Sequence, residues 1–129
     1  MKYEVNIEVK NGYDVIVVGS GPSGVAAAIM AGRNGAKTLL IESCGRVGGI
    51  STSGLMSHFT GWVGNKIFLE ILNRASKKNH FPCDAINRID PEMLTLTYIE
   101  MLEEAGVDTL LYTNVCDVLM EGDKIGSVI

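Results

Sequence analysis

Three glycines with the spacing Gly-x-Gly-x-x-Gly stand at Gly19, Gly21 and Gly24, inside the stretch VIVVGSGPSG. In such a turn the first glycine permits a tight bend, the second lets the backbone approach a pyrophosphate, and the third lets a helix pack closely on a strand. The spacing alone is weak, because the chain holds 15 glycines. These three, however, follow a predicted strand and open a predicted helix. They therefore predict a site for the phosphates of a dinucleotide at the start of that helix.

The carboxylate of Glu42 is the second group with suitable chemistry. It ends the next predicted strand, roughly 20 residues beyond the glycine turn, where a carboxylate accepts hydrogen bonds from both hydroxyls of a ribose. A 2′-phosphate would meet a like charge there, so an NADP-type ligand is disfavoured. A glycine turn that binds nothing is the structural alternative.

The elements that must position these residues alternate between strand and helix patterns. An apolar run over 13–18 is typical of a central parallel strand buried on both faces. Pro22 suits the first turn of the helix that follows, and Gly35 suits its left-handed end. A second apolar run covers 37–42. The order strand, helix, strand predicts a parallel sheet, and the right-handed crossover rule makes this βαβ unit part of one sheet.

Two more helices and three short strands are predicted downstream. The ranges 65–78 and 90–106 each place apolar residues on one helical face, and 107–112 reads as a third strand. The range 115–129 reads as two antiparallel strands around a Glu-Gly-Asp-Lys turn, the beginning of a meander. Alternating apolar residues over 3–9 predict a half-buried strand at the start. The fold class is therefore α/β, a Rossmann-like βαβ domain with a parallel sheet and an antiparallel β-hairpin.

Composition limits the class of protein. A chain of 129 residues with net charge −4, 47% hydrophobic and 20% charged, suits one soluble globular domain and suggests no nucleic-acid partner. It has neither an apolar run that could cross a bilayer nor the apolar core of a signal peptide. The three cysteines lack CxxC spacing, so we expect free, buried thiols and a reducing compartment, the cytoplasm. No metal site is expected. The polar range 77–84 is the one candidate internal break.

The residues that follow the acidic strand end carry a resemblance. In ESCGRVGG, Glu42 precedes Arg46, Gly48 and Gly49, a pattern that resembles the flavoprotein superfamily of glutathione reductase, amine oxidases and fumarate reductases. The resemblance covers nearly all of 12–129 and implies FAD as cofactor. It implies that the double glycine runs beneath FAD, that the arginine reaches the pyrophosphate, and that a later backbone amide contacts adenine. A solvated surface arginine is the alternative for Arg46. The cofactor-binding residues implied are Gly19, Ser20, Gly21, Pro22, Ser23, Gly24, Glu42, Ser43, Arg46, Gly48, Gly49 and Val115.

The stretch after the double glycine narrows the subfamily. GGISTSG holds no redox cysteine pair, which excludes disulfide reduction, and Ile50 stands where amine oxidases usually have arginine. The chain looks most similar to proteins described broadly as FAD-dependent oxidoreductases, near the fumarate reductase branch. His58 is the one catalytic candidate, since histidine exchanges protons near neutral pH. A loop histidine bonded to backbone or solvent is its commoner alternative.

We therefore expect residues 1–129 to form the FAD-binding domain of a flavin-dependent oxidoreductase with a small-molecule substrate. The resemblance implies an amino-terminal part whose substrate domain is absent, inactive by itself and prone to self-association through exposed strand edges. Two alternatives remain open. One is a non-catalytic dinucleotide-binding or electron-relay module, and the other is an NAD-utilising protein similar to thiazole synthases.

Overall fold

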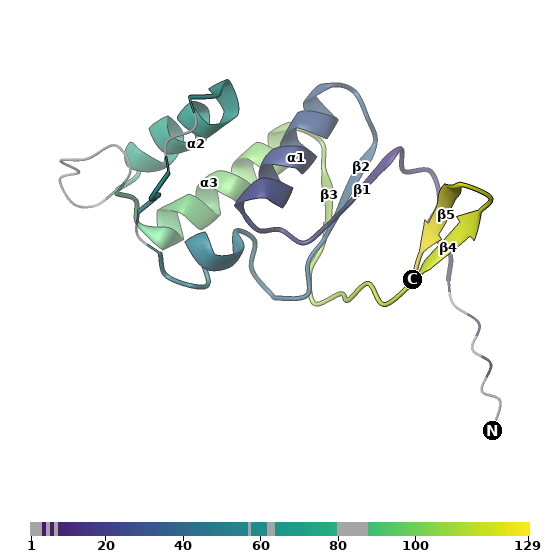
Figure 1. The fold of residues 1–129 in the computed structure, drawn as a ribbon. Coiled ribbons are helices and arrows are strands. Elements are labelled where there is room, and N and C mark those ends of the chain that lie inside the picture. Colours follow the sequence, from purple (N-terminus) through teal and green to yellow (C-terminus); the bar gives the residue numbers. More distant parts are fainter. Residues whose placement is uncertain (1–3, 5, 7, 57, 62–63, 80–87) are drawn as a thin grey trace.

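A computed structural model of the protein describes residues 4, 6, 8–56, 58–61, 64–79 and 88–129 (Figure 1). Three parallel strands form one sheet in the order β1-β2-β3. Their bounds are Val15–Val18 for β1, Thr38–Ile41 for β2 and Asp108–Leu110 for β3. Leu40 pairs with Val17 on one side and Thr109 on the other. The central strand is β2, which is buried along its whole length.

The prediction that the apolar run over 13–18 is a central strand buried on both faces is wrong for this sheet, because among the described strands β1 pairs only with β2, and its Ile16 and Val18 are 37% and 57% exposed. An apolar run indicates a strand, whereas its place in the sheet depends on which other strands pair with it.

Three helices lie on one side of this sheet (Figure 1). Their bounds are Pro22–Arg33 for α1, Lys66–Ser76 for α2 and Pro91–Glu104 for α3, and a single 3-10 turn, η1, spans Gly49–Ser51. Helix α1 packs on β1 and β2, α3 packs on α1, and α2 packs on α3. The fully buried side chains of this core include Val25, Ile29, Leu40, Leu72, Leu94, Tyr98 and Met101.

The helix ends follow the local signals in the sequence. Pro22 occupies the first turn of α1, and Gly35, with φ +86°, takes the left-handed conformation just after it. The Asn65 side chain caps α2 by accepting a hydrogen bond of 2.9 Å from the Phe68 N–H. Asp90 caps α3 in the same way through the second residue of that helix. The predicted helices are therefore confirmed, with bounds shifted by a few residues.

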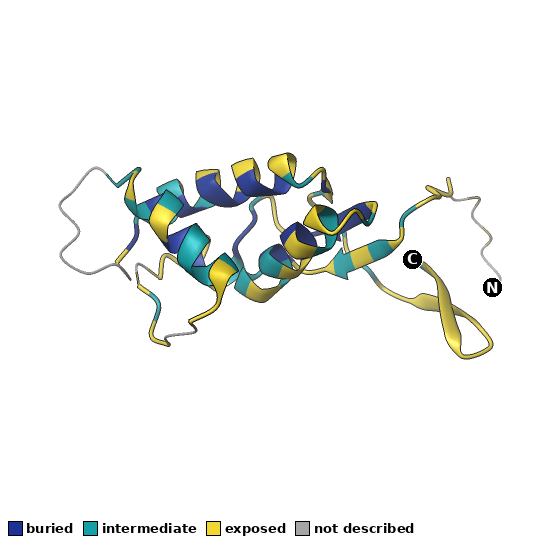
Figure 2. Ribbon diagram, turned by 90° about the horizontal axis from the view of Figure 1, so that it is seen from above, coloured by how far each residue is buried: buried dark blue, intermediate teal, exposed yellow. Residues whose placement is uncertain are grey.

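The carboxyl-terminal strands form a separate two-stranded sheet. Strands β4 (Val118–Glu121) and β5 (Lys124–Val128) pair antiparallel around a turn in which Gly122 has φ +64°. Figure 2 shows this hairpin exposed on almost its whole surface, whereas the helices bury one side. The predicted hairpin is confirmed, and so is the α/β class of a Rossmann-like domain.

Three further strand predictions need correction. The described residues within 3–9, which are residues 4, 6, 8 and 9, form no strand, and Val9 is 70% exposed. Alternation makes a strand only where a partner completes the hydrogen-bond ladder, and no described strand pairs with this segment. The third strand ends at Leu110 because Tyr112 has φ +53°, which breaks the extended backbone. The hairpin strand begins at Val118, so Val115 lies in an irregular segment before it.

Other expectations fall partly outside the described residues. The polar range 77–84 is described only as far as residue 79, and Cys83 lies beyond it. Cys44 and Cys116 are free thiols as expected, but both are exposed, so the prediction of buried cysteines is wrong for them. Within the described ranges, no helix combines the length and the apolar character that crossing a membrane requires.

Candidate functional site

The glycine turn joins the end of β1 to α1, and two of its glycines meet strict steric demands. Gly19 has φ +90°, and its N–H donates to the Ile41 carbonyl at 2.8 Å. A Cβ placed on Gly24 would lie 1.9 Å from the Gly19 carbonyl oxygen, so only glycine lets the helix lie this close to the strand. Gly21 is different, because a Cβ there would meet no heavy atom within 4 Å. The turn is therefore tight on its inner side and open at Gly21.

The amino terminus of α1 faces this open space. Gly21 is the N-cap and, among the described residues, no side chain caps the helix or adds an acidic group to its first turn. The first N–H groups of a helix lack intrahelical partners, and the helix dipole adds roughly half a positive charge there. Ser23 in this turn is exposed. The site therefore offers backbone donors and positive potential to an anion such as a pyrophosphate.

Glu42 follows β2 directly, and its carboxylate is buried, with 8% of the residue exposed. One oxygen, Oε2, accepts hydrogen bonds from the Ser20 N–H at 2.7 Å and the Ser20 hydroxyl at 2.6 Å. The other, Oε1, accepts from the Cys44 N–H at 2.8 Å and the Ser43 hydroxyl at 3.1 Å. The carboxylate thus joins the end of β2 to the glycine turn.

These hydrogen bonds keep Glu42 ionised. Burial by itself would raise the pKa of this carboxyl, but the bonds from Ser20, Cys44 and Ser43 outweigh it and lower the pKa to about 2. A fixed negative charge therefore lies beside the turn at neutral pH. It suits neutral hydroxyl donors and repels an additional phosphate.

The double glycine packs against the same turn. The Gly48 N–H donates to the Ser20 carbonyl at 2.7 Å, and a Cβ placed on Gly49 would lie 3.1 Å from the Gly21 Cα. Both glycines have positive φ, +106° and +55°. The structure therefore brings together the first glycine turn, Glu42 and the second glycine loop, while the position of the double glycine beneath FAD stays a prediction.

Sequence reasoning missed the two residues that hold this second loop. The Ser51 hydroxyl donates to the Gly48 carbonyl at 2.6 Å, and the buried Thr52 hydroxyl donates to the Val47 carbonyl at 2.6 Å. Small hydroxyl residues often bond back to carbonyl groups a few positions earlier. The serine and threonine residues of GGISTSG were therefore the available signal for these bonds.

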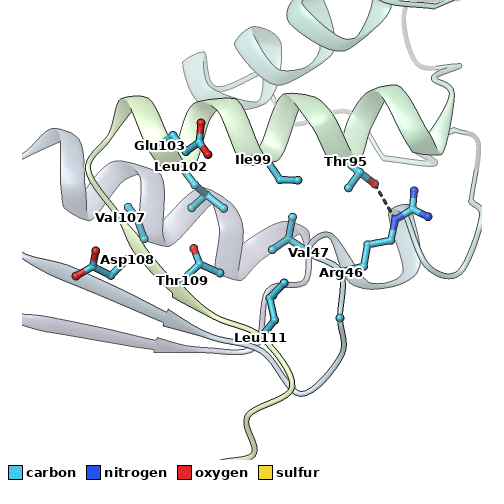
Figure 3. Close-up of a pocket in the computed structure, with 11 residues that line it drawn as sticks. Arg46, Val47, Thr95, Ile99, Leu102, Glu103, Val107, Asp108, Thr109 and Leu111 are labelled. Atoms are coloured by element: carbon cyan, nitrogen blue, oxygen red, sulfur yellow. Dashed lines mark hydrogen bonds between the residues drawn. The ribbon is translucent and has the colours of Figure 1, made fainter. Parts of the chain in front are cut away.

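Arg46 turns toward α3. Its Nε donates to the Thr95 hydroxyl at 2.8 Å, as Figure 3 shows, and its other nitrogens bond to Glu92 at 2.8 Å and to the Pro91 carbonyl at 3.1 Å. The guanidinium therefore joins the loop after β2 to the first turn of α3. Its contact with a pyrophosphate stays a prediction.

Two cavities border the site. One, of about 390 Å³, lies between α3 and β3, with Val47, Leu102 and Leu111 around it (Figure 3). The other, of about 430 Å³, lies between α1 and α2 and is lined by Pro22, Ser23, Phe59, Phe68 and Tyr98, among others. Because the second cavity reaches Pro22 and Ser23, it adjoins the predicted phosphate site.

The remaining candidates lie further from these contacts. His58 is exposed and forms an isolated antiparallel bridge with Arg88, next to the residue Phe59 that lines the α1–α2 cavity. Val115 is partly buried in the segment between β3 and β4. The roles assigned to both stay predictions. In the part of the chain that the structure describes, no group of three or more His, Cys, Asp or Glu side chains could hold a metal ion.

The fold and the site together define a Rossmann-like dinucleotide-binding domain. Comparison with known families makes this more specific, because the family model described as FAD dependent oxidoreductase matches residues 14–129. The chain therefore belongs to the FAD-dependent oxidoreductase family, as the resemblance predicted, and FAD is the cofactor of that family. The open Gly21, the uncapped α1 and the ionised Glu42 fit such a ligand.

Individual relatives show how far the similarity extends. The chain is 32% identical to the thiamine thiazole synthase of Methanococcus maripaludis over 90% of its own length and 45% of that protein. It is 33% identical to the glutathione reductase of Schizosaccharomyces pombe over 64% of its length and 18% of that protein. The chain thus spans less than half the length of these curated relatives.

Solved structures confirm the fold. Lactococcus lactis thioredoxin reductase superposes with a TM-score of 0.61 and 26% identity, over 92% of this chain and 30% of that one. Thermovibrio ammonificans THI4 gives a TM-score of 0.68 with 18% identity, over 90% of this chain and 46% of that one. Both likenesses extend to nearly the whole of this chain.

Proposed function

We propose that this chain forms the FAD-binding part of an oxidoreductase that transfers hydride or electrons between bound FAD and a small-molecule substrate. The bound flavin supplies the redox chemistry, while the protein supplies binding, orientation and electrostatics. One observation carries the proposal: the open space at Gly21 lies at the uncapped start of α1, with the ionised Glu42 next to it. The space at Gly21 and the first N–H groups of α1 suit a pyrophosphate, and the Glu42 carboxylate suits a ribose.

The hydrogen bonds of Glu42 suggest how it exchanges partners on binding. Two of its four donors are backbone N–H groups, of Ser20 and Cys44, and the other two are the hydroxyls of Ser20 and Ser43. Hydroxyl groups rotate to suit their surroundings. Two ribose hydroxyls can therefore replace the two serine hydroxyls, while the backbone bonds keep the carboxylate in place.

Equilibrium titration of the 129-residue chain with FAD, followed by flavin fluorescence, tests this proposal. We expect saturable binding that a Gly21→Val variant loses while its circular dichroism spectrum stays native, because the added side chain fills the space meant for the pyrophosphate. Equal FAD binding by the folded variant and the parent chain would overturn the placement of the cofactor.

A thiazole synthase-like function is the second candidate. Thiamine thiazole synthases match 90% of this chain, a larger share than glutathione reductase matches. Glu42 suits the ribose of an NAD-type ligand as well as that of FAD. Parallel titrations with FAD and NAD separate the two functions, since a clear preference for NAD would favour the second.

We also infer a cytoplasmic location and a catalytic role that needs sequence outside these 129 residues.

We infer, in addition, that the chain self-associates through the hairpin. Exposed apolar side chains on the hairpin support self-association, among them Leu119 at 53% and Ile125 at 64%. Sedimentation velocity should find dimers or larger species that an Ile125→Lys variant shifts toward monomer. A parent chain that sediments as a monomer would remove self-association from the proposal.

A further inference from the structure

Tyr112 lies two residues after the end of β3 and has a backbone conformation that bulky residues rarely adopt. Its φ is +53°, and 81% of the residue is exposed. A non-glycine residue with positive φ is uncommon, and such strain persists only where the surroundings hold it. Hydrophobic burial does not account for a large aromatic ring left so exposed. The position therefore needs another explanation.

Contacts with the loop after β2 fix both the backbone and the ring of Tyr112. Its N–H donates to the Cys44 carbonyl at 3.2 Å, and the next N–H, of Thr113, donates to the Glu42 carbonyl at 2.9 Å. The phenol lies against Gly45, where an added Cβ would come 2.0 Å from the Tyr112 hydroxyl oxygen. The glycine thus makes room for the ring, and the ring is held at the same edge of the sheet as Glu42.

This edge is where the base of a bound nucleotide would lie. Ligands of open α/β sheets bind outside the carboxyl ends of the strands, and Tyr112 and Glu42 follow the carboxyl ends of the adjacent strands β3 and β2. A base is attached directly to the ribose that Glu42 would hold. Nucleic-acid bases stack on exposed aromatic rings, whatever the base, because each has a π-face.

We propose that the Tyr112 ring is a stacking platform for the adenine of the bound dinucleotide, with Gly45 and the strained backbone setting its position. The inference rests on the proposed function, since it assumes that a ribose binds at Glu42. It adds a residue that contributes affinity at the adenine end of the ligand and makes no claim about the flavin end.

Titration of the 129-residue chain with ADP tests the platform, because ADP carries the adenine, the ribose and the two phosphates without the flavin. Tyr112→Phe and Tyr112→Leu form a matched pair that shares the unfavourable backbone but differs in the aromatic ring. We expect Phe to keep the affinity within about twofold and Leu to lower it by about 5- to 100-fold, the range of base stacking on aromatic side chains. Affinity for FMN, which lacks adenine, should be the same in both.

A third variant separates the ring from the backbone strain. Tyr112→Asn removes the ring and tolerates positive φ, so it should lose ADP affinity while its thermal midpoint stays equal to or above that of the parent. Equal ADP affinity in the Leu, Asn and parent chains would overturn the platform. Glu42→Ala is the reference: if it weakens ADP binding while the Tyr112 variants do not, only this inference fails. If the parent chain binds no ADP, the proposed function fails with it.

Discussion

The Glu42 carboxylate and Ser20 are joined through a single oxygen, which accepts both the backbone N–H and the hydroxyl of the serine, at 2.7 and 2.6 Å. The residue that would bind a ribose is therefore bonded to the turn that would bind the phosphates. The two halves of the predicted site form one hydrogen-bonded unit before any ligand is present. The consequences for binding and for stability can be measured separately.

Removing this carboxylate should weaken cofactor binding. Hydrogen bonds to a charged group contribute about 1.5–3 kcal/mol, so Glu42→Ala should weaken FAD binding by that amount. Isothermal titration measures it, with Glu103→Ala, an exposed glutamate of α3, as the control. A dissociation constant equal to that of the parent would exclude Glu42 from the site.

The lowered pKa of Glu42 makes part of the folding stability dependent on acid. The pKa falls from 4.5 to about 2 on folding, so the contribution is complete above pH 4.5 and is lost as the pH falls through 2. The shift corresponds to about 3 kcal/mol. Urea unfolding between pH 7 and 2 should show a steeper loss in the parent chain than in Glu42→Gln. Parallel curves for the two proteins would contradict the shift, since the other carboxylates are common to both.

Gly24 and Gly21 should differ sharply in how much stability the same substitution costs. Gly24→Ala places a methyl group 1.9 Å from the Gly19 carbonyl and should lower the free energy of unfolding by at least about 1–3 kcal/mol. Gly21→Ala meets no atom within 4 Å and has ordinary backbone angles, with φ −60°, so it should leave the stability almost unchanged. Thermal unfolding of the pair compares them directly. A stable Gly24→Ala protein would contradict the close helix–strand approach.

Arg46 should contribute more to stability than its partner Glu92 does. The arginine donates to three groups of α3, whereas Glu92 has a largely exposed side chain. Exposed ion pairs contribute about 0–1 kcal/mol, so Glu92→Gln should change little and Arg46→Met more. Urea unfolding measures both. ADP affinity, measured on the folded Arg46→Met protein, then decides whether the guanidinium also reaches a phosphate: loss beyond the effect of Glu92→Gln supports it, and unchanged affinity leaves the arginine a structural role.

The sequence predicted the parts of the site that depend on local chemistry. Glycine spacing, an apolar strand before it and an acidic residue after the next strand were enough to place the turn and Glu42, because each follows from steric or hydrogen-bonding needs of a short segment. Helix ends were equally readable from Pro22, Asp90 and the glycines that follow the helices.

Structural features that depend on residues far apart in the chain could not be predicted from the sequence. Arg46 bonds to a helix that begins 45 residues later, and no pattern in ESCGRVGG predicts these hydrogen-bond partners. The alternating segment at the start lacked a described strand to pair with, which alternation alone cannot supply. The end of β3 depended on the positive φ of Tyr112, a conformation that the sequence around a tyrosine does not suggest.

The central position of β2 predicts the order in which the strands unfold locally. Its residues pair with both neighbouring strands, and all four are buried, whereas β1 and β3 each pair on one side within this sheet. Amide hydrogen exchange should therefore be slowest in β2 and faster in β1 and β3, and fastest in the exposed hairpin. Since Glu42 follows β2 without a break, its carboxylate is attached to the segment that unfolds last. A nucleotide bound at Glu42 would then be attached to the strand whose amide hydrogens exchange most slowly, while those of the hairpin exchange fast.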